Sequence, residues 1–213
     1  DAATAMAPYS DWNFNRLTGT ATFKSKKVLG FESKKRPDLN RNFVVHVRER
    51  IVAGKIWTDD NGVPGQEGYN IEGNSSNDML RKNYLVDQFY GYNNLFSHYH
   101  FPGEGNLRGF VGRGERGAEA LVSSTTELGL FKNIARDNQD PMDLEFVTFI
   151  DGGIFFNRNK SRVLADAGIG IRLNTKLYER DIYFRLDLPF YIYDGDVSNI
   201  SVNNWVFSFQ RSI

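Results

Sequence analysis

Residues 164–174 read LADAGIGIRLN, and apolar side chains alternate in this stretch with polar side chains or glycine. Successive side chains of a β-strand point to opposite faces, so a period of two separates these residues into two sets. One face would carry Ala165, Ala167, Ile169, Ile171 and Leu173, and the other Asp166, Gly168, Gly170, Arg172 and Asn174. The stretch therefore predicts a strand with one apolar and one polar face.

The same alternation recurs along most of the chain. It predicts strands at 43–57, 120–131, 144–156 and 181–192, a last strand at about 203–213, and weaker strands at 12–24 and 78–90. The apolar faces hold Phe43, Val45, Val47, Ile51 and Ala53, then Val122, Leu128 and Leu130, then Phe146, Ile150 and Ile154, and finally Ile182, Phe184, Leu186, Leu188, Phe190 and Ile192. Seven or eight strands of roughly 10 residues result, a length that crosses a bilayer when the strand is tilted. We therefore predict an all-β fold.

The polar faces favour a membrane barrel over a soluble one. A soluble sandwich or lipocalin-like barrel also alternates, but its apolar face fills a core. Here the polar faces combine Arg, Asp and Glu with repeated glycine, and long polar connections at 59–77 and 93–119 contrast with a tight one at 157–161. This is the pattern of an antiparallel transmembrane β-barrel. A soluble β-barrel that binds a small apolar ligand remains an alternative.

Composition excludes several other classes. The 213 residues carry 26 basic and 26 acidic side chains, so no basic excess exists to bind nucleic acid. Cysteine is absent, which excludes disulfides and thiolate metal sites. No run approaches the length of a transmembrane helix. The first residue is Asp, so we expect a processed chain or a fragment of a longer one, with residues 1–213 in one domain.

The candidate site is a glycine-flanked arginine in a long loop at about 91–119. The loop contains Leu107-Arg108-Gly109-Phe110, and the strands that follow place Glu127 and Asp151 on their polar faces. A planar guanidinium suits bidentate contacts with carboxylates, so Arg108 could reach this pair from inside a barrel. The alternative is that both carboxylates are ordinary charges in a water-filled lumen.

These residues resemble the bacterial surface antigen family, the BamA-like outer-membrane assembly and translocation barrels. Five blocks occur in the order of the family's motifs: Leu107-Arg108-Gly109-Phe110, Thr125-Thr126-Glu127-Leu128, Phe149-Ile150-Asp151-Gly152-Gly153, 165–172, and 184–190 with its proline. The resemblance covers residues 84–213 well and the earlier part loosely. Members usually finish on an aromatic residue, whereas this sequence finishes Gln210-Arg211-Ser212-Ile213.

The resemblance implies a fold, a location and a function. The motif loop folds into the lumen of a sixteen-strand barrel, where Arg108 pairs with Glu127 and Asp151. This chain would supply about eight strands, the second half, and its last strand would meet a first strand supplied by the rest of the barrel, in the same chain or another. The protein would insert or translocate proteins at the outer membrane of a Gram-negative bacterium. Its partners would be membrane lipids, client outer-membrane or secreted proteins and accessory lipoproteins.

Two further functions stay open, and other signals are weak. The barrel could anchor or export a fused passenger domain, or it could be a stand-alone structural barrel, since about eight strands can close alone. We expect no enzyme activity, cofactor or metal site, because His98 and His100 lack a third ligand and residues 59–62 lack the closing Glu of a calcium loop. The glycines at 109, 112, 114 and 117 lack the features of a phosphate loop, so we interpret them as the flexible stem of the motif loop.

Overall fold

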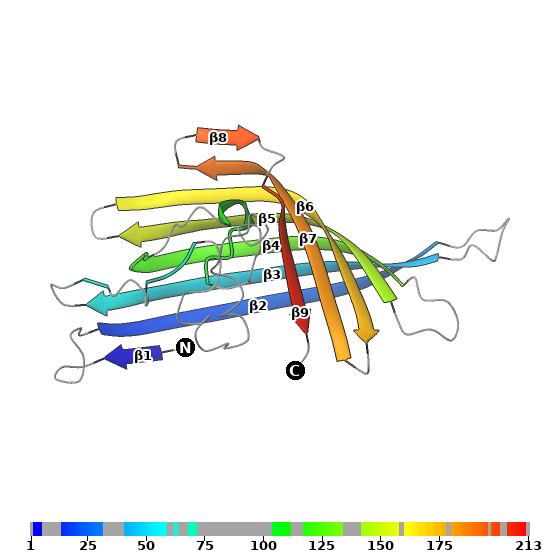
Figure 1. Cartoon of the computed structure of the whole chain (residues 1–213), viewed down its shortest axis with the longest axis horizontal. Coiled ribbons are helices and arrows are strands. Elements are labelled where there is room, and N and C mark those ends of the chain that lie inside the picture. The colour runs from blue at the N-terminus through cyan, green and yellow to red at the C-terminus, as the bar shows by residue number, and fades with distance from the viewer. Residues whose placement is uncertain are drawn as a thin grey trace.

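The described residues form one antiparallel sheet of nine strands in a computed structural model (Figure 1). The structure describes residues 2–5, 14–31, 41–58, 62–63, 68–71, 104–111, 117–133, 142–157, 160–177, 180–195, 197–200 and 204–211. The strands are β1 (Ala2–Ala5), β2 (Phe14–Phe31), β3 (Arg41–Thr58), β4 (Ala120–Asn133), β5 (Met142–Asn157), β6 (Lys160–Leu177), β7 (Arg180–Asp194), β8 (Val197–Ile200) and β9 (Val206–Arg211). A single 3-10 turn, η3 (Arg108–Phe110), lies between β3 and β4 in the described part of the sequence.

The strands follow one another in sequence order from β1 to β7, and β7 then has two partners. Its second half pairs with β8 and its first half with β9. Figure 1 shows β6, β7 and β9 turning steeply across the direction of β2 and β3. Among the strands that the structure describes, neither β8 nor β9 pairs with β1, so the sheet has open edges.

The predicted strands at 43–57, 120–131, 144–156, 164–174 and 181–192 are confirmed as β3 to β7, and each extends beyond its predicted bounds. The weaker strand at 12–24 is confirmed as the first part of β2. The predicted last strand at 203–213 is confirmed over β9, Val206–Arg211, while 204–205 precede the strand and residues 203, 212 and 213 lie outside the described residues. The prediction at 78–90 lies outside the described residues. The short strands β1 and β8 were not predicted.

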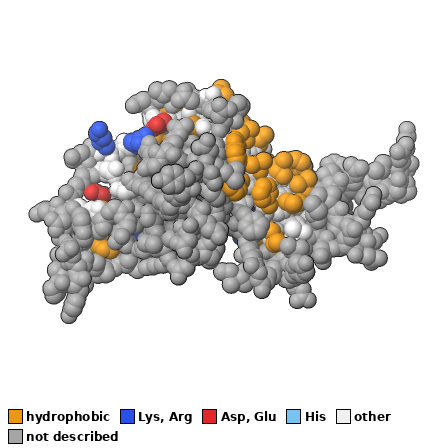
Figure 2. Space-filling view, viewed as in Figure 1, with side chains coloured by type: hydrophobic (Ala, Val, Ile, Leu, Met, Phe, Trp, Pro, Cys, Tyr) orange, Lys and Arg blue, Asp and Glu red, His pale blue; other side chains and the backbone are white. Residues whose placement is uncertain are grey.

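The two faces of the sheet differ sharply in polarity. We call the face that η3 covers the inner face and the opposite one the outer face. Glu127, Glu145 and Asp151 are buried on the inner face, whereas Phe146 (53% exposed) and Ile150 (64% exposed) lie on the outer face. Figure 2 shows hydrophobic side chains gathered where β6 and β7 curve past β9. Large exposed apolar side chains in the middle of the sheet, such as Phe146 and Ile150, therefore lie on the outer face.

One predicted face is wrong at the end of β7. We expected Ile192 to lie beside Leu186, but Ile192 is buried at 1% exposure and Leu186 lies on the outer face. The register of β6 and β7 shifts between Ala167 and Gly168, which leaves Phe190 as an extra residue. Such a bulge inverts the alternation beyond it. Ile192 therefore points inward and packs in the core.

The apolar core lies between the sheet and two segments that come between β3 and β4 in the sequence, residues 68–71 and 104–111. Gly105 and Leu107 donate backbone hydrogen bonds to the carbonyls of Asn70 and Ile71, over 3.0 Å each. The core gathers side chains from both loop segments and from β2 to β7, namely Phe14, Val52, Ile56, Tyr69, Ile71, Leu107, Phe110, Ala118, Leu121, Phe155, Leu164 and Ile192. The loop thus forms an inner layer on the sheet. None of the helices among the described residues is long and apolar enough to cross a membrane.

Candidate functional site: a buried arginine lock

The backbone before Arg108 is fixed by hydrogen bonds to both the loop and β4. Asn106 has a φ of 60°, the one positive value among the described non-glycine residues. Asparagine tolerates this left-handed conformation better than most residues do. Its Nδ2 donates to Thr125 Oγ1 over 3.0 Å, and Ser123 Oγ donates to the Glu104 carbonyl over 3.1 Å. The chain therefore enters η3 in a defined direction.

Arg108 is the centre of the site. Its Nε donates to Asp151 Oδ2 over 2.8 Å and its Nη2 to Asp151 Oδ1 over 3.0 Å, so the contact is bidentate. Its Nη2 also lies 2.9 Å from Glu127 Oε1, and its Nη1 lies 3.4 Å from Asp187 Oδ2. Carboxylates from β4, β5 and β7 thus hold one guanidinium. A planar group with several fixed donors is well suited to this task.

Burial and packing strengthen the electrostatics of this contact. The side chain of Arg108 has no exposed surface, and its guanidinium carbon lies 3.7 Å from the centre of the Phe149 ring. Burial alone lowers the pKa of the Arg108 guanidinium, but the surrounding carboxylates outweigh it and raise that pKa above its ordinary value. Arg108 is therefore a permanent buried cation.

Gly109 lets the loop approach the sheet closely. Its backbone N–H donates to Asp166 Oδ2 over 3.0 Å. A Cβ at this position would lie 2.8 Å from the Asp166 Cβ and 2.9 Å from the Ile192 Cγ1. Any side chain would therefore force the loop away from β6 and β7. Glycine is needed at this position because there is no space for a side chain, and not because of the backbone φ angle.

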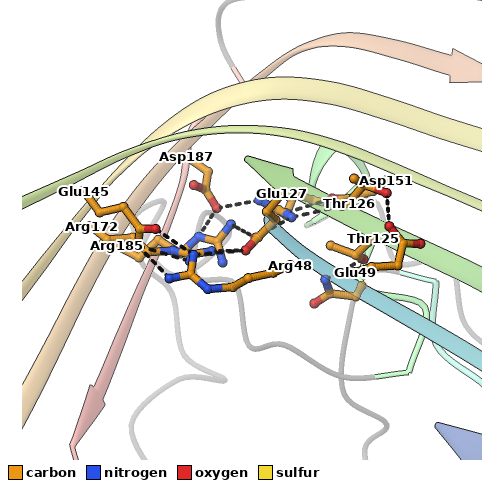
Figure 3. Close-up of polar contacts among 12 residues, drawn as sticks. Arg48, Glu49, Thr125, Thr126, Glu127, Glu145, Asp151, Arg172, Arg185 and Asp187 are labelled. Atoms are coloured by element: carbon orange, nitrogen blue, oxygen red, sulfur yellow. Dashed lines mark hydrogen bonds and ion pairs between the residues drawn. The ribbon is translucent and has the colours of Figure 1, made fainter. Parts of the chain in front are cut away.

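Further arginines from the strands extend the cluster beside Arg108. Arg172 and Arg185 both donate to Glu127, the latter over 2.8 Å. Arg48 reaches Glu145, with Nη1 2.8 Å from Oε1. Figure 3 shows these three strand arginines gathered beside Glu127 and Glu145. The cluster binds β3, β4, β6 and β7 together through the interior rather than through backbone hydrogen bonds alone.

Charge within the cluster is nearly balanced. Four arginines (Arg48, Arg108, Arg172 and Arg185) face five carboxylates (Glu127, Glu145, Asp151, Asp166 and Asp187). Asp166 differs from the others, because its Oδ2 accepts a backbone N–H and its Oδ1 has no hydrogen-bond partner among the described atoms. The other four carboxylates each face a guanidinium.

Tyr69 forms a second anchor between the loop and the sheet. It is fully buried, and its hydroxyl donates to the Leu17 carbonyl over 2.9 Å and lies 2.9 Å from Thr18 Oγ1. The Arg16 guanidinium lies 4.6 Å from the centre of the Tyr69 ring and also pairs with Glu104. The segment 68–71 is thus attached to β2, while Arg108 attaches the segment 104–111 to β4, β5 and β7.

The structure brings together the residues that the sequence singled out. Arg108 lies within 3.0 Å of both Glu127 and Asp151, and Leu107 and Phe110 are buried in the core beside it. Sequence reasoning missed the contributions of Asp166, Asp187, Glu145, Arg48, Arg172 and Arg185. Part of their signal was available, because all of them fall on the polar faces of predicted strands, but the register that brings β7 to the site was not.

Comparisons with known protein families, curated proteins and solved structures find no match to this chain.

The site's chemistry is that of a structural lock. Among the described residues, the carboxylates of the cluster contact guanidinium groups or a backbone N–H. Within the described ranges, no three His, Cys, Asp or Glu side chains could hold a metal ion. His98, His100 and residues 59–61 lie outside those ranges. What the cluster can do is hold a long loop in one position against a sheet.

Proposed function

We propose that this chain is the C-terminal part of an outer-membrane β-barrel that inserts or translocates proteins at the outer membrane of a Gram-negative bacterium. In this proposal it supplies about eight strands, the second half of a sixteen-strand barrel of the bacterial surface antigen family. The observation that carries the proposal is the buried lock between Arg108 of the loop and the inward carboxylates of Glu127 and Asp151.

The polarity of the two faces supports a membrane location. Phe146, Ile150 and Leu128 are about half exposed or more on the outer face, while a cluster of charged side chains is buried on the inner face beside the apolar core. In water, such a surface would be an aggregation hazard unless a partner covered it. In a bilayer it would meet lipid, and the polar lumen would hold the charges. The soluble-barrel alternative requires the opposite arrangement.

The geometry of the lock supports the proposed family membership separately from the sequence of the motif. The family resemblance implies one contact, between the motif arginine and the carboxylates of two later strands. The geometry contains that contact and adds a third carboxylate, Asp187. The open edges of the described sheet are also what half of a larger barrel would have. In the proposed mechanism, the fixed loop shapes the lumen while the sheet edge receives the remaining strands.

The proposal is tested with the native polypeptide that contains this sequence, purified from outer-membrane extracts and reconstituted in vesicles. We expect it to accelerate the folding of a urea-denatured outer-membrane barrel, followed by gel mobility, over vesicles without protein. An Arg108→Ala variant should lose most of this acceleration. Recovery of the protein from the soluble fraction would refute the membrane location. Stable insertion without any effect on client folding would favour an anchor or exporter of a passenger domain instead.

A further inference from the structure

Glu49 interrupts the apolar outer face of β3 near its middle. The outer-face neighbours of Glu49 along the strand are Val47 and Ile51, both exposed apolar side chains. Across the sheet it is level with Phe23 on β2 and with Thr126 on β4. The lock of Arg108 lies at nearly the same level on the other face, since Asp151 is level with Thr125. A carboxylate thus occupies the centre of the surface that the proposed function assigns to lipid.

Two hydroxyl groups orient this carboxylate. Ser124 Oγ donates to Glu49 Oε1 over 2.6 Å, and Thr126 Oγ1 donates to Glu49 Oε2. Among the residues that the structure describes, no Lys or Arg forms an ion pair with Glu49. Neutral hydroxyls leave the charge in place, and each carboxylate oxygen can accept a second hydrogen bond. Glu49 is therefore positioned by its neighbours but not neutralised by them.

Small residues lie in one row beside Glu49, whereas Phe23 (61% exposed) and Ile150 (64% exposed) stand in the row of Glu49 itself. Ala21, Gly152 and Ala165 lie on the outer face in the row next to Glu49, and Ala53 follows on β3. Small residues of this kind are enriched where membrane-spanning segments pack together. The contrast with the large side chains of β5 to β7, such as Phe146 and Leu186, makes this part of the outer face distinct.

We propose that Glu49, Ser124 and Thr126 form a docking site for a membrane-spanning segment of a partner protein that presents Lys or Arg at mid-membrane depth. The inference rests on the proposed membrane location. An ionised side chain facing lipid is costly, so such residues commonly pair with an opposite charge. A cation from the partner would complete the hydrogen bonding of Glu49 and neutralise its charge.

A second copy of this chain fits the site less well. A two-fold axis along the membrane normal would place two Glu49 side chains at the same depth, where like charges repel. Lys55 is a cation on the outer face of the same strand, but it lies six residues away, about 20 Å along the strand. Its ammonium also lies 5.5 Å from the centre of the Trp57 ring. The charge pattern therefore favours a different protein as the partner.

The test uses the native protein in neutral bicelles and a synthetic probe. The probe is a fluorescent transmembrane helix of about 20 leucines with one central lysine. An all-leucine helix and a helix with a central glutamate serve as controls. We expect the lysine helix to bind about tenfold more tightly than the all-leucine helix. Glu49→Gln, which removes the charge but keeps a similar shape and one acceptor oxygen, should reduce this preference to less than twofold. Asp194→Asn, at the end of β7, should leave it unchanged.

Each outcome separates the inference from the proposed function. Brominated acyl chains in the same samples should quench the fluorescence of Trp57, which is exposed on the outer face. Absent quenching would refute the membrane location and with it the docking site. Normal quenching with equal binding of the lysine and leucine helices would refute the docking site alone. So would a preference that survives Glu49→Gln, or self-association of the protein that Glu49→Gln abolishes.

Discussion

Arg108 Nε and Asp151 Oδ2 lie 2.8 Å apart, and neither side chain has any exposed surface. Pairs of this kind are not strong net stabilisers, because taking both charges out of water offsets most of their attraction. Removing one partner is different, since the other charge then stays buried without compensation. The main effect of the pair is therefore to fix the position of η3 on the sheet, because any displacement of η3 from β5 would separate two buried charges.

Arg108→Ala should lower the free energy of unfolding by about 3–5 kcal/mol, because three carboxylates lose their shared cation. Arg108→Lys should recover little of this loss, since an ammonium cannot reproduce the bidentate contact with Asp151. The measurement is the urea midpoint of the native protein in detergent micelles. Arg162→Ala, which breaks an exposed pair with Asp194, is the control and should cost at most about 1 kcal/mol. Equal effects of the two alanine variants would contradict the lock.

Asp151→Asn and Asp166→Asn should differ although the two aspartates are direct partners in the pairing of β5 and β6. Asp151 accepts two guanidinium N–H groups. An asparagine would place its own NH2 group against one of these donors, so we expect the free energy of unfolding to fall by at least about 3 kcal/mol. Asp166 accepts the Gly109 N–H, which an asparagine oxygen can also accept, and it makes no direct contact with the Arg108 guanidinium among the described residues. Its substitution should change stability by less than about 1 kcal/mol. A larger loss for Asp166→Asn would mean that Asp166 shares in holding the guanidinium.

The strands could be predicted from the sequence because each has one polar and one apolar face, and this gives a strict period of two. The inward direction of Glu127 and Asp151 followed from the same period. The contact of Arg108 with Asp187 could not be predicted, since it depends on the register of β5, β6 and β7 and on how the sheet curves. The inward position of Ile192 depends on a bulge that has no signal in the alternation.

The loop was the least predictable part of the site. Tyr69 lies in a segment without periodicity, and its partners Arg16 and Thr18 are more than fifty residues away in sequence. Only tertiary packing brings them together. The position of Glu49 on the outer face could have been found from the sequence, because Glu49 is the one charged residue in an otherwise apolar series at alternate positions from Phe43 to Ala53.

Gly109→Ala should displace the loop and lower the free energy of unfolding by about 1–3 kcal/mol, the usual cost of excess volume in a packed interior. The added Cβ would meet Asp166 and Ile192 at less than 3 Å. Gly152→Ala is a matched control on β5, because its Cβ would find its nearest atom at 3.9 Å. Faster proteolysis within residues 59–119 would report the displacement. Comparable proteolysis of both variants would show that the space beside Gly109 is not limiting.

Tyr69→Phe and Tyr69→Ala should separate the hydrogen bonds of the second anchor from its packing. Phenylalanine removes only the hydroxyl and should cost about 1 kcal/mol. Alanine also empties a fully buried aromatic position and should cost about 3–5 kcal/mol. Proteolysis should accelerate in the first part of the loop for Tyr69→Ala and in the second part for Arg108→Ala. Identical cleavage patterns would mean that the loop is released as one unit rather than held at two points.

Ile150→Arg tests whether the outer face of the sheet contacts lipid or water. Ile150 is 64% exposed near the middle of β5. If that face meets lipid, an arginine there should destabilise the protein by about 2–4 kcal/mol and reduce its yield in the membrane fraction. Thr20→Arg provides the comparison, because Thr20 is exposed and its pairing with the buried Val52 places it on the inner face. An arginine in a water-filled lumen should change stability by less than about 1 kcal/mol. If both variants behaved like the unmodified protein, the outer face would be in contact with water, and the membrane location would be wrong.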